Sequence, residues 1–445
     1  MILVEQHTIK FNNKNKELFE RIDSFCYASK NLRNYTNYII KQCSRISYKL
    51  KQGEILDSWE KGLIYRINCA IKKYNSTRPD KKPLKSIDDT NSFVADAYFL
   101  SWYLKDFDVY KQMPMATTAQ ICIQNICKDW KAFYKGMQAW KKNSDNMLGK
   151  PNVPKYYDKE TGRNWIVLTN QLAKVNKNNR IELPKAFGGI NVKFRHTNLQ
   201  QVRVITTKTA IKINLCYKKD DSKATLKSNK NTMAIDIGVN NMATVTFSDY
   251  AEPIIIDGRE IKSHNQWYNK EKARLQEMSK VLNNRYDTSR MDRLTQRRNN
   301  KVKDYMHKAS RMIVNLAIQN NVGQIVIGNN QGWKQEVHIG KKNNQNFVNI
   351  PYDALIKMIT YKAKLQGMVV TVTDEKYTSG TSYLDGEEPT KENYKKARRK
   401  HRGLFVSNRG ISINADVNGS YQIMKKIGMI PPIKPKEKVV RLKVA

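Results

Sequence analysis

Two aspartates occupy positions where a carboxylate could bind a metal ion. Asp236 interrupts the apolar segment MAIDIG (233–238), and a carboxylate inside a buried strand is costly unless it is paired or binds a cation. Asp416 stands in INADVNGSY (413–421), at the start of the predicted last helix. Carboxylate oxygens are the ligands that Mg²⁺ and Mn²⁺ prefer. Two simpler interpretations stay open. Asp236 caps a turn at the end of its strand, or the negative charge of Asp416 interacts favourably with the positive end of its helix dipole.

The charge of the chain indicates a polyanionic partner. Its 80 Lys and Arg residues against 40 Asp and Glu leave a net charge of +40, about one uncompensated positive charge per eleven residues. A chain so charged repels itself unless something neutralises it, and long nucleic acid does this better than a membrane surface. No run approaches the ~18 apolar residues of a membrane-spanning helix, and the start MILVEQHTIK lacks the pattern of a secretion signal. We therefore expect no membrane partner.

The composition also predicts a folded protein of a reducing compartment. Hydrophobic residues make up 40% of the chain, and 23 Tyr, 12 Phe and 7 Trp are too many for a solvated polyelectrolyte. The six cysteines form no CxxC pair, and none lies in the last 229 residues. Free thiols are therefore expected rather than a disulfide framework. The predicted location is the cytoplasm, in association with the nucleoid of a prokaryote.

A change in the spacing of apolar residues along the chain predicts several domains. Apolar residues at a spacing of three to four indicate helices between residues 11 and 147. Short alternating segments such as IKINLCY (211–217) then indicate strands, which predict a small β-barrel together with a first strand. Further on, three strands, a helix, a strand, a helix, a strand and a final helix form the element order of an RNase H-like α/β sheet. The predicted parts are residues 1–10, 11–147, 148–230 and 231–445, with a basic insert at about 376–412.

Seven motifs resemble the signatures of the transposon-encoded TnpB (OrfB) family and follow one another along the chain in the same order as in that family. DIGVNNMAT (236–244) and INADVNGSY (413–421) contain the two aspartates. The resemblance runs over nearly the full length of the chain. The other five motifs are QICIQNICKDWKAFYKGMQAWKK (120–142), RRNNKVKDYMHKAS (297–310), NNQGWKQ (329–335), KKNNQNF (341–347) and YTSGTS (377–382).

The resemblance implies a bilobed, multidomain RNA-guided nuclease. A helical recognition (REC) domain and a small wedge (WED) β-barrel would precede a RuvC nuclease domain, whose basic insert would bind the target nucleic acid. The implied partners are a guide RNA and a target DNA duplex, with one protein monomer per RNA favoured. Compact type V CRISPR effectors share this architecture. The resemblance therefore leaves open whether the chain works beside a transposon or a CRISPR array.

Two departures from the common pattern of the family concern metal ligands. Most members place a glutamate after the strand of the second RuvC motif, where this chain ends the segment IVIG at Gly328. Most also carry two CxxC pairs in the insert, where this chain has no cysteine. A structural zinc ion is not expected there, because four nitrogen or sulfur ligands cannot be assembled from His401 alone.

A neighbouring strand could supply the missing carboxylate. In an RNase H-like sheet, the strand ending at Gly328 should lie beside the parallel strand 368–373, about 4.8 Å away. Asp374 and Glu375 follow that strand, and Glu375 is preferred because its side chain is longer and because the family resemblance includes a branch that reads E-x-Y-T-S. Solvated acids at a strand end are the alternative.

With Glu375 in place of the glutamate that is absent at position 328, three carboxylates are available for a divalent-metal site. Hydrolysis of a phosphodiester by paired ions needs carboxylates that hold two Mg²⁺ or Mn²⁺ ions about 3.5 to 4 Å apart. Asp236 would bridge both ions, and Glu375 and Asp416 would each complete one side. The predicted catalytic and metal-binding residues are therefore Asp236, Glu375 and Asp416.

Further candidates would bind nucleic acid. Polar side chains on a helix of the first third could read base edges of a short flanking DNA motif, and basic side chains after residue 296 could hold a phosphate backbone or form a solvated face. A tryptophan after residue 328 could stack on a base or pack in a core. The basic run of the insert could guide a single strand or be an unstructured charged face. The four groups are Thr118, Gln120 and Gln124; Arg297, Arg298 and Lys308; Trp333, Lys334 and Gln335; and Lys395, Lys396, Arg398, Arg399, Lys400 and Arg402.

The favoured function is that of an RNA-guided DNA endonuclease, in which base pairing supplies sequence choice and the protein reads a short flanking motif. The alternative is a nuclease-inactive RNA-guided repressor. It stays open because this chain has Gly328 where most family members have a glutamate. A third interpretation is a structural RNA-binding protein, for which the positive charge of the chain alone would be sufficient. A DNA transposase is a minor fourth interpretation, because it would not need RNA-holding domains.

Overall fold

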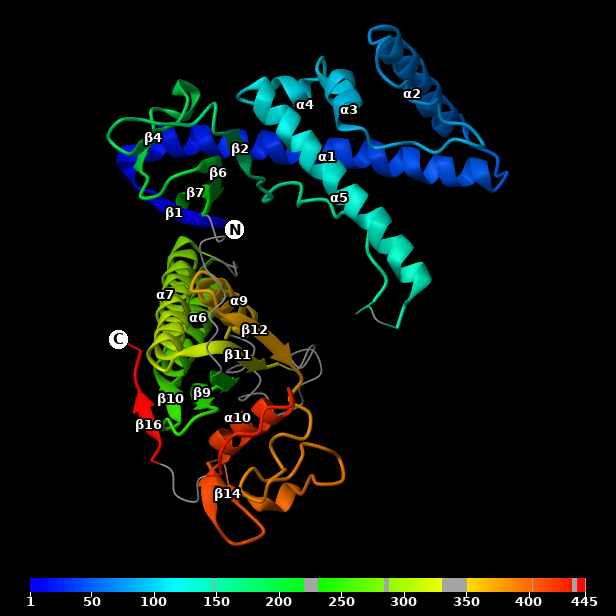
Figure 1. Ribbon diagram of the computed structural model, residues 1–445. Helices are drawn as coiled ribbons and strands as arrows, with labels where there is room; N and C mark the ends of the chain where they lie inside the picture. The colour runs from blue at the N-terminus through cyan, green and yellow to red at the C-terminus, as the bar shows by residue number, and fades with distance from the viewer. Residues whose placement is uncertain are drawn as a thin grey trace. The chain divides into compact units, whose positions relative to one another are not determined.

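The computed structural model describes residues 1–145, 147, 149–219, 231–283, 288–329, 350–401, 403–433 and 438–444. The chain divides into two compact units, Met1–Lys219 and Asp220–Ala445, and each is described by itself (Figure 1). In the described part of the chain, no helix combines the length and the apolar character needed to cross a membrane.

Long amphipathic helices build most of the first unit. The first of them buries Ile22, Cys26, Ile39 and Cys43 along one face, at the spacing that the sequence predicts. A capping box starts the next, in which the carboxylate of Asp57 accepts from a backbone amide at the helix start. The helices are α1 (Lys16–Lys51), α2 (Ser58–Ser76), α3 (Ala97–Leu104), α4 (Asp108–Lys111) and α5 (Ala116–Lys142), with short 3₁₀ turns η1 (Asn13–Asn15) and η2 (Lys185–Phe187).

Two sheets complete the first unit, and the strand pairing does not join them into the single small barrel that the sequence predicts. One has the strand order β1-β7-β6-β2, in which β1 pairs antiparallel with β7 across 200 positions of sequence, and the other has the order β3-β4-β5. Helices α1 and α5 pack against the larger sheet and share its hydrophobic core, so the sheet buries its apolar side without closing on itself. The strands are β1 (Ile2–Lys10), β2 (Ile166–Thr169), β3 (Lys174–Val175), β4 (Arg180–Glu182), β5 (Asn191–Lys193), β6 (Leu199–Thr207) and β7 (Ala210–Lys218).

A six-stranded mixed sheet forms the centre of the second unit, with the order β12-β11-β8-β9-β10-β16. The predicted mixed α/β sheet is confirmed, and β8, β11 and β12 run parallel. The last strand, β16, pairs parallel with β10. The strands are β8 (Asn231–Asp236), β9 (Asn241–Phe247), β10 (Ile254–Asp257), β11 (Val322–Gly328), β12 (Val369–Thr373) and β16 (Val440–Leu442).

Helices cover the two faces of this sheet differently (Figure 1). Met233 and Ile235 of β8 pack in one cluster with residues of α7 and α9, whereas Ala234 packs with Ile423 and Met424 of α10. Because side chains alternate along a strand, Asp236 has the parity of Ala234 and belongs to the α10 face. The helices are α6 (Arg259–Asn283), α7 (Ser289–Gln319), α9 (Tyr352–Lys364) and α10 (Ala415–Lys425).

The basic insert between β12 and α10 is folded. Arg398 is 7% exposed and forms two hydrogen bonds with the carboxylate of Glu387, at 2.5 and 2.8 Å. Beside this pair, the rings of Tyr383 and Tyr421 stack with centroids 4.0 Å apart, in a small cluster that includes Phe405. The insert contains a 3₁₀ turn η3 (Lys396–Arg398) and a three-stranded sheet of β13 (Arg399–His401), β14 (Leu404–Val406) and β15 (Ser412–Asn414).

Candidate active site

Three parallel strands end at one edge of the large sheet, as the sequence predicts. The register pairs Ile327 of β11 with Ile235 of β8, and Gly328 of β11 with Thr373 of β12. Asp236, the residue after Ile235, therefore ends its strand level with Gly328. Glu375 follows two residues after Thr373 on the neighbouring strand.

The side chain of Glu375 occupies the space that a side chain at position 328 would need. A Cβ atom built on Gly328 would lie 2.7 Å from Cγ and 2.8 Å from Oε1 of Glu375. Real Cβ atoms essentially never approach other atoms so closely. The glycine and the glutamate therefore fit together, and a glutamate at position 328 could not be added beside Glu375 without a rearrangement.

Asp374, the other acid at the end of β12, is engaged elsewhere. Its Oδ1 atom accepts a hydrogen bond of 2.7 Å from Nζ of Lys426, at the end of α10, and another from the backbone amide of Lys376. The ammonium group of Lys426 lowers the pKa of Asp374. The pairing of Asp374 with Lys426 is consistent with the preference for Glu375 as the candidate ligand.

Asp416 is positioned by the start of α10. The side chain of Asn414 caps this helix by accepting from the backbone amides of Asp416 and Val417, at 3.0 and 3.3 Å. The carboxylate of Asp416 then accepts hydrogen bonds from Nδ2 of Asn241 at 2.6 Å and from the guanidinium of Arg399 at 3.0 Å. Residues from β9, from the insert and from α10 thus meet at this carboxylate.

A glycine in α10 makes room for Asp236. A Cβ atom on Gly419 would lie 2.9 Å from Oδ2 of Asp236. The next residue, Ser420, donates a hydrogen bond of 3.1 Å to the backbone carbonyl of Ala234. Small side chains at this point allow the helix to lie close to β8, so that Asp236 reaches the same site as Asp416.

Replacing Gly419 by alanine should separate helix stability from activity. Alanine favours a helix by about 1 kcal/mol over glycine, but its methyl group would displace the carboxylate of Asp236. We expect the DNA cleavage that the family resemblance implies to fall by about 10- to 100-fold, with no loss of thermal stability. The matched control is Gly62→Ala in α2, where a Cβ atom meets nothing within 4 Å. Equal cleavage by the two variants would contradict this account of Gly419.

The three carboxyl groups repel one another electrostatically. Burial, followed by the charges of Glu375 and Asp416, raises the pKa of Asp236 well above its usual value, and Arg399 offsets only part of this. Burial and then the charge of Asp374 raise the pKa of Glu375 to about 7. The raised pKa values of Asp236 and Glu375 mark an electrostatic environment that a divalent cation would relieve.

The donor atoms at this site fit a hard divalent cation, because carboxylate oxygens surround the strand ends. Across the described ranges, however, no three His, Cys, Asp or Glu side chains are already arranged to hold a metal ion. The contacts of Asp416 with Arg399 and Asn241 show one reason, since both of its oxygens have hydrogen-bond partners. Binding an ion would require the carboxylates to reorient.

The raised pKa of Glu375 predicts how pH changes stability. A carboxyl group that binds its proton more tightly when folded stabilises the fold below pH about 4.5, and this contribution is lost as pH rises through about 7. Between these values, metal-free protein should lose up to about 3 kcal/mol relative to a Glu375→Gln variant. Urea unfolding from pH 4.5 to 8 in a chelator measures the difference, and Mg²⁺ at pH 8 should restore stability to the unsubstituted protein. Parallel pH profiles of the two proteins would contradict the prediction.

The structure separates the candidates for reading DNA in the first unit. Gln120 is exposed and Gln124 is half-buried on α5. Thr118 is 1% exposed, and its hydroxyl group donates to the carbonyl of Met115. Thr118 is therefore wrong as a base-contacting residue in this conformation, because the helix packs it into the core.

The basic candidates of the second unit also differ in their surroundings. Arg298 is half-buried and donates to Oδ1 of Asn265 at 2.8 Å, whereas Arg297 is exposed and Lys308 forms an ion pair with Asp304. In the insert, Lys395, Lys396 and Lys400 are exposed and Arg399 reaches Asp416. Arg398 is wrong as a nucleic-acid contact, because both of its terminal nitrogens bind Glu387. Trp333, Lys334, Gln335 and Arg402 lie outside the described residues.

Three residues that contact the acids at this edge of the sheet were missed by the sequence analysis. Asn241 lies within the motif DIGVNNMAT, and Gly419 lies within INADVNGSY, so both could have been found from the motifs. Lys426 stands in no motif. Only its contact with Asp374, 52 positions away, shows that it matters.

Comparisons with known proteins give two family matches. The family OrfB_IS605, described as a probable transposase, matches residues 214–334, and the Cas12f1-like TNB domain matches residues 352–423. No curated protein matches the chain.

Several solved structures are similar over most of their length. A Cas12f1–sgRNA–target DNA complex has 14% identity and a TM-score of 0.33, covering 94% of this chain and 98% of the other. A CRISPR-Cas12f ternary complex has 13% identity and a TM-score of 0.36, covering 96% and 86%. The mini-RNA-guided endonuclease CRISPR-Cas_phi3 has 10% identity and a TM-score of 0.41, covering 98% and 93%.

Proposed function

We propose that this chain, which carries the signatures of the OrfB_IS605 family and of the Cas12f1-like TNB domain, is an RNA-guided DNA endonuclease. The observation that carries the proposal is the meeting of Asp236, Glu375 and Asp416, which are spread over 180 positions of sequence. A guide RNA would neutralise much of the +40 charge and select the target by base pairing. Gln120 and Gln124 are the candidates for contacting a short flanking motif in the DNA.

Asp236, Glu375 and Asp416 are the residues that would hold two Mg²⁺ or Mn²⁺ ions. When bound, such ions supply an activated water and stabilise the leaving oxygen of a phosphodiester. Residues of the chain position these ligands. Asn241 orients Asp416 through a hydrogen bond, and Gly419, which has no side chain, leaves space for the carboxylate of Asp236. Arg399 places a guanidinium beside the carboxylates, where it could pair with a phosphate group of the strand.

A second function stays open because of Gly328. A chain that lacks the usual glutamate of its family could bind RNA-selected DNA without cutting it and act as a repressor. The position of Glu375 favours the nuclease, since its carboxyl fills the space beside Gly328 and contributes to the raised pKa of Asp236.

One experiment separates the two functions. The protein is purified with its RNA, the RNA is sequenced, and the complex is incubated with DNA that matches the guide segment. Cleavage in Mg²⁺ that stops in EDTA and is lost in Asp236→Asn supports the nuclease. Tight binding of matching DNA without cleavage supports the repressor, and RNA of random sequence that washes off in salt rejects both.

A further inference from the structure

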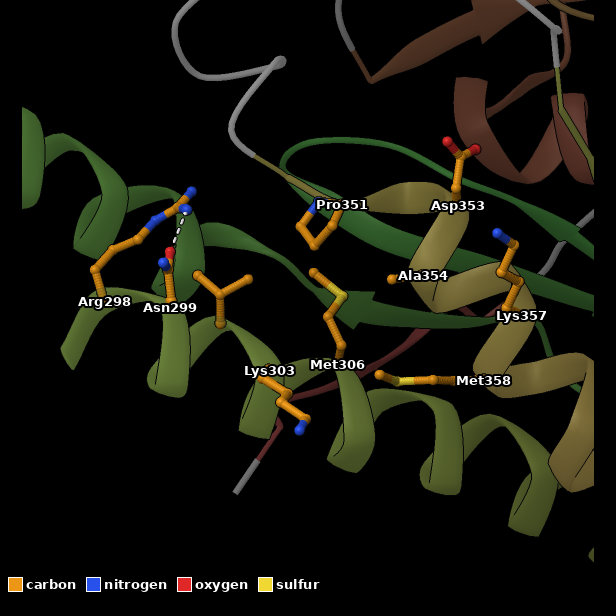
Figure 2. A pocket seen from close by; sticks show the side chains of 10 residues that line it. Arg298, Asn299, Lys303, Met306, Pro351, Asp353, Ala354, Lys357 and Met358 are labelled. Carbon is orange, nitrogen blue, oxygen red and sulfur yellow. Dashed lines mark hydrogen bonds between the residues drawn. The ribbon is translucent and has the colours of Figure 1, made fainter. Parts of the chain in front are cut away.

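A hollow of about 690 Å³ lies between α7 and α9 (Figure 2). Its size is within the range of about 300 to 1,000 Å³ that is typical of ligand sites. Helices α7 and α9 pack on the face of the sheet opposite α10, whereas Asp236 belongs to the α10 face. The sheet therefore separates this hollow from the candidate active site.

The floor of the hollow is apolar. Val302 and Met306 of α7 line it together with Pro351, which precedes α9, and with Ala354 and Met358 of α9. Val302 and Met306 are buried, whereas Ala354 and Met358 are half-buried. Methionine side chains adapt to flat surfaces and make favourable sulfur contacts with aromatic rings.

The rim of the hollow is cationic. Arg298 and Lys303 of α7 and Lys357 of α9 surround it, against one acid, Asp353. Arg298 is oriented by two hydrogen bonds, to Oδ1 of Asn265 at 2.8 Å and to Oδ1 of its neighbour Asn299 at 3.0 Å. Three positive groups around an apolar floor suit a ligand that combines a flat apolar part with a negative charge at its edge.

We propose that this hollow binds an unpaired nucleotide of the guide RNA, an inference that rests on the proposed function. A base turned out of its helix offers a flat face to the methionines, and its phosphates lie within reach of the rim. A paired base is held in its duplex and cannot enter a hollow. The DNA strand that is cut must pass the α10 face of the sheet, so a stably bound RNA is the occupant that the opposite face suits.

Two variants test the hollow in the full-length protein with its RNA. Ala354→Trp fills the floor, and Lys357→Glu reverses one charge of the rim at an exposed position. Lys364→Glu is the matched control, because Lys364 is also exposed on α9 but does not line the hollow. Both test variants should weaken RNA binding by about tenfold, and the control should not. Chemical probing of the RNA 2′-hydroxyl groups should find one nucleotide that is protected in the unsubstituted complex and reactive in both test variants.

The inference is overturned if RNA probing is identical in the unsubstituted protein and Ala354→Trp, or if Lys364→Glu weakens binding as much as Lys357→Glu. A change of oligomeric state in the test variants, without a change in RNA protection, would instead assign the hollow to contacts between copies of the chain and would also overturn it. Failure of the proposed function is distinguishable, because the unsubstituted protein would then hold no RNA of defined sequence.

Discussion

Replacing Glu375 by glutamine should lower the rate of DNA cleavage by about 1,000-fold while leaving the binding of guide RNA and target DNA intact. The amide keeps the shape of the side chain but removes the negative charge that a metal ion needs. Single-turnover cleavage of guided DNA in Mg²⁺ measures the rate, and a gel-shift experiment measures binding.

The control for this variant is Asp374→Asn, one residue earlier. It makes the same change from carboxylate to amide, but Asp374 is paired with Lys426 rather than with the site. We expect a change in cleavage of less than about threefold, because the Asp374 side chain is 52% exposed and an ion pair open to solvent contributes little. Equal losses in the two variants would show that the end of β12 matters only as a structural element.

A relocation experiment tests whether Glu375 replaces a residue at position 328. In Gly328→Glu alone, the new side chain would collide with Glu375 and with Cδ1 of Ile423, at 2.7 and 2.5 Å from the Cβ atom. Combining Gly328→Glu with Glu375→Ala and Ile423→Val removes both obstacles. We expect the triple variant to recover cleavage relative to Glu375→Ala with Ile423→Val, and no recovery would contradict the exchange of positions.

Replacing Arg398 by alanine should destabilise the second unit by at least about 3 kcal/mol, because it leaves the carboxylate of Glu387 largely buried without its cation. The expected value lies at the low end of the range for buried pairs, since the Glu387 side chain keeps 16% of its surface exposed. Urea unfolding and proteolysis of the insert measure the effect. Lys400→Ala, an exposed position of the same insert, should change stability by less than about 0.5 kcal/mol.

A second substitution identifies the cause. Glu387→Gln combined with Arg398→Ala removes the unpaired charge and should be less destabilising than Arg398→Ala alone. A zinc chelator should leave the unfolding of the unsubstituted protein unchanged, because the sequence offers no set of four zinc ligands in the insert. Loss of the insert's structure in the chelator would show that the ion pair is not what holds it.

The sequence predicted the strand edge correctly because each strand can be read from its own residue pattern, and parallel neighbours end at the same edge of a sheet. Alternation along β8 and the parallel pairing of β11 with β12 place Asp236, Gly328 and the end of β12 at one level. From the pairing, the acids at 374 and 375 followed as the candidates for the missing ligand. The sheets of the first unit differ from a single barrel for another reason: α1 and α5 share a core with the larger sheet, and strand patterns do not record what packs on them.

Adjacent residues of similar type show what only the tertiary structure decided. Arg398 and Arg399 stand in one basic run, yet one binds Glu387 and the other binds Asp416. Asp374 and Glu375 differ in role because Lys426, 52 positions away, neutralises the first. The sequence by itself determined the charge of the chain, the order of its elements and which acids can reach the sheet edge. Which of these side chains face the site depends on partners brought in by folding, and the free energy of burying a charge is set by those partners.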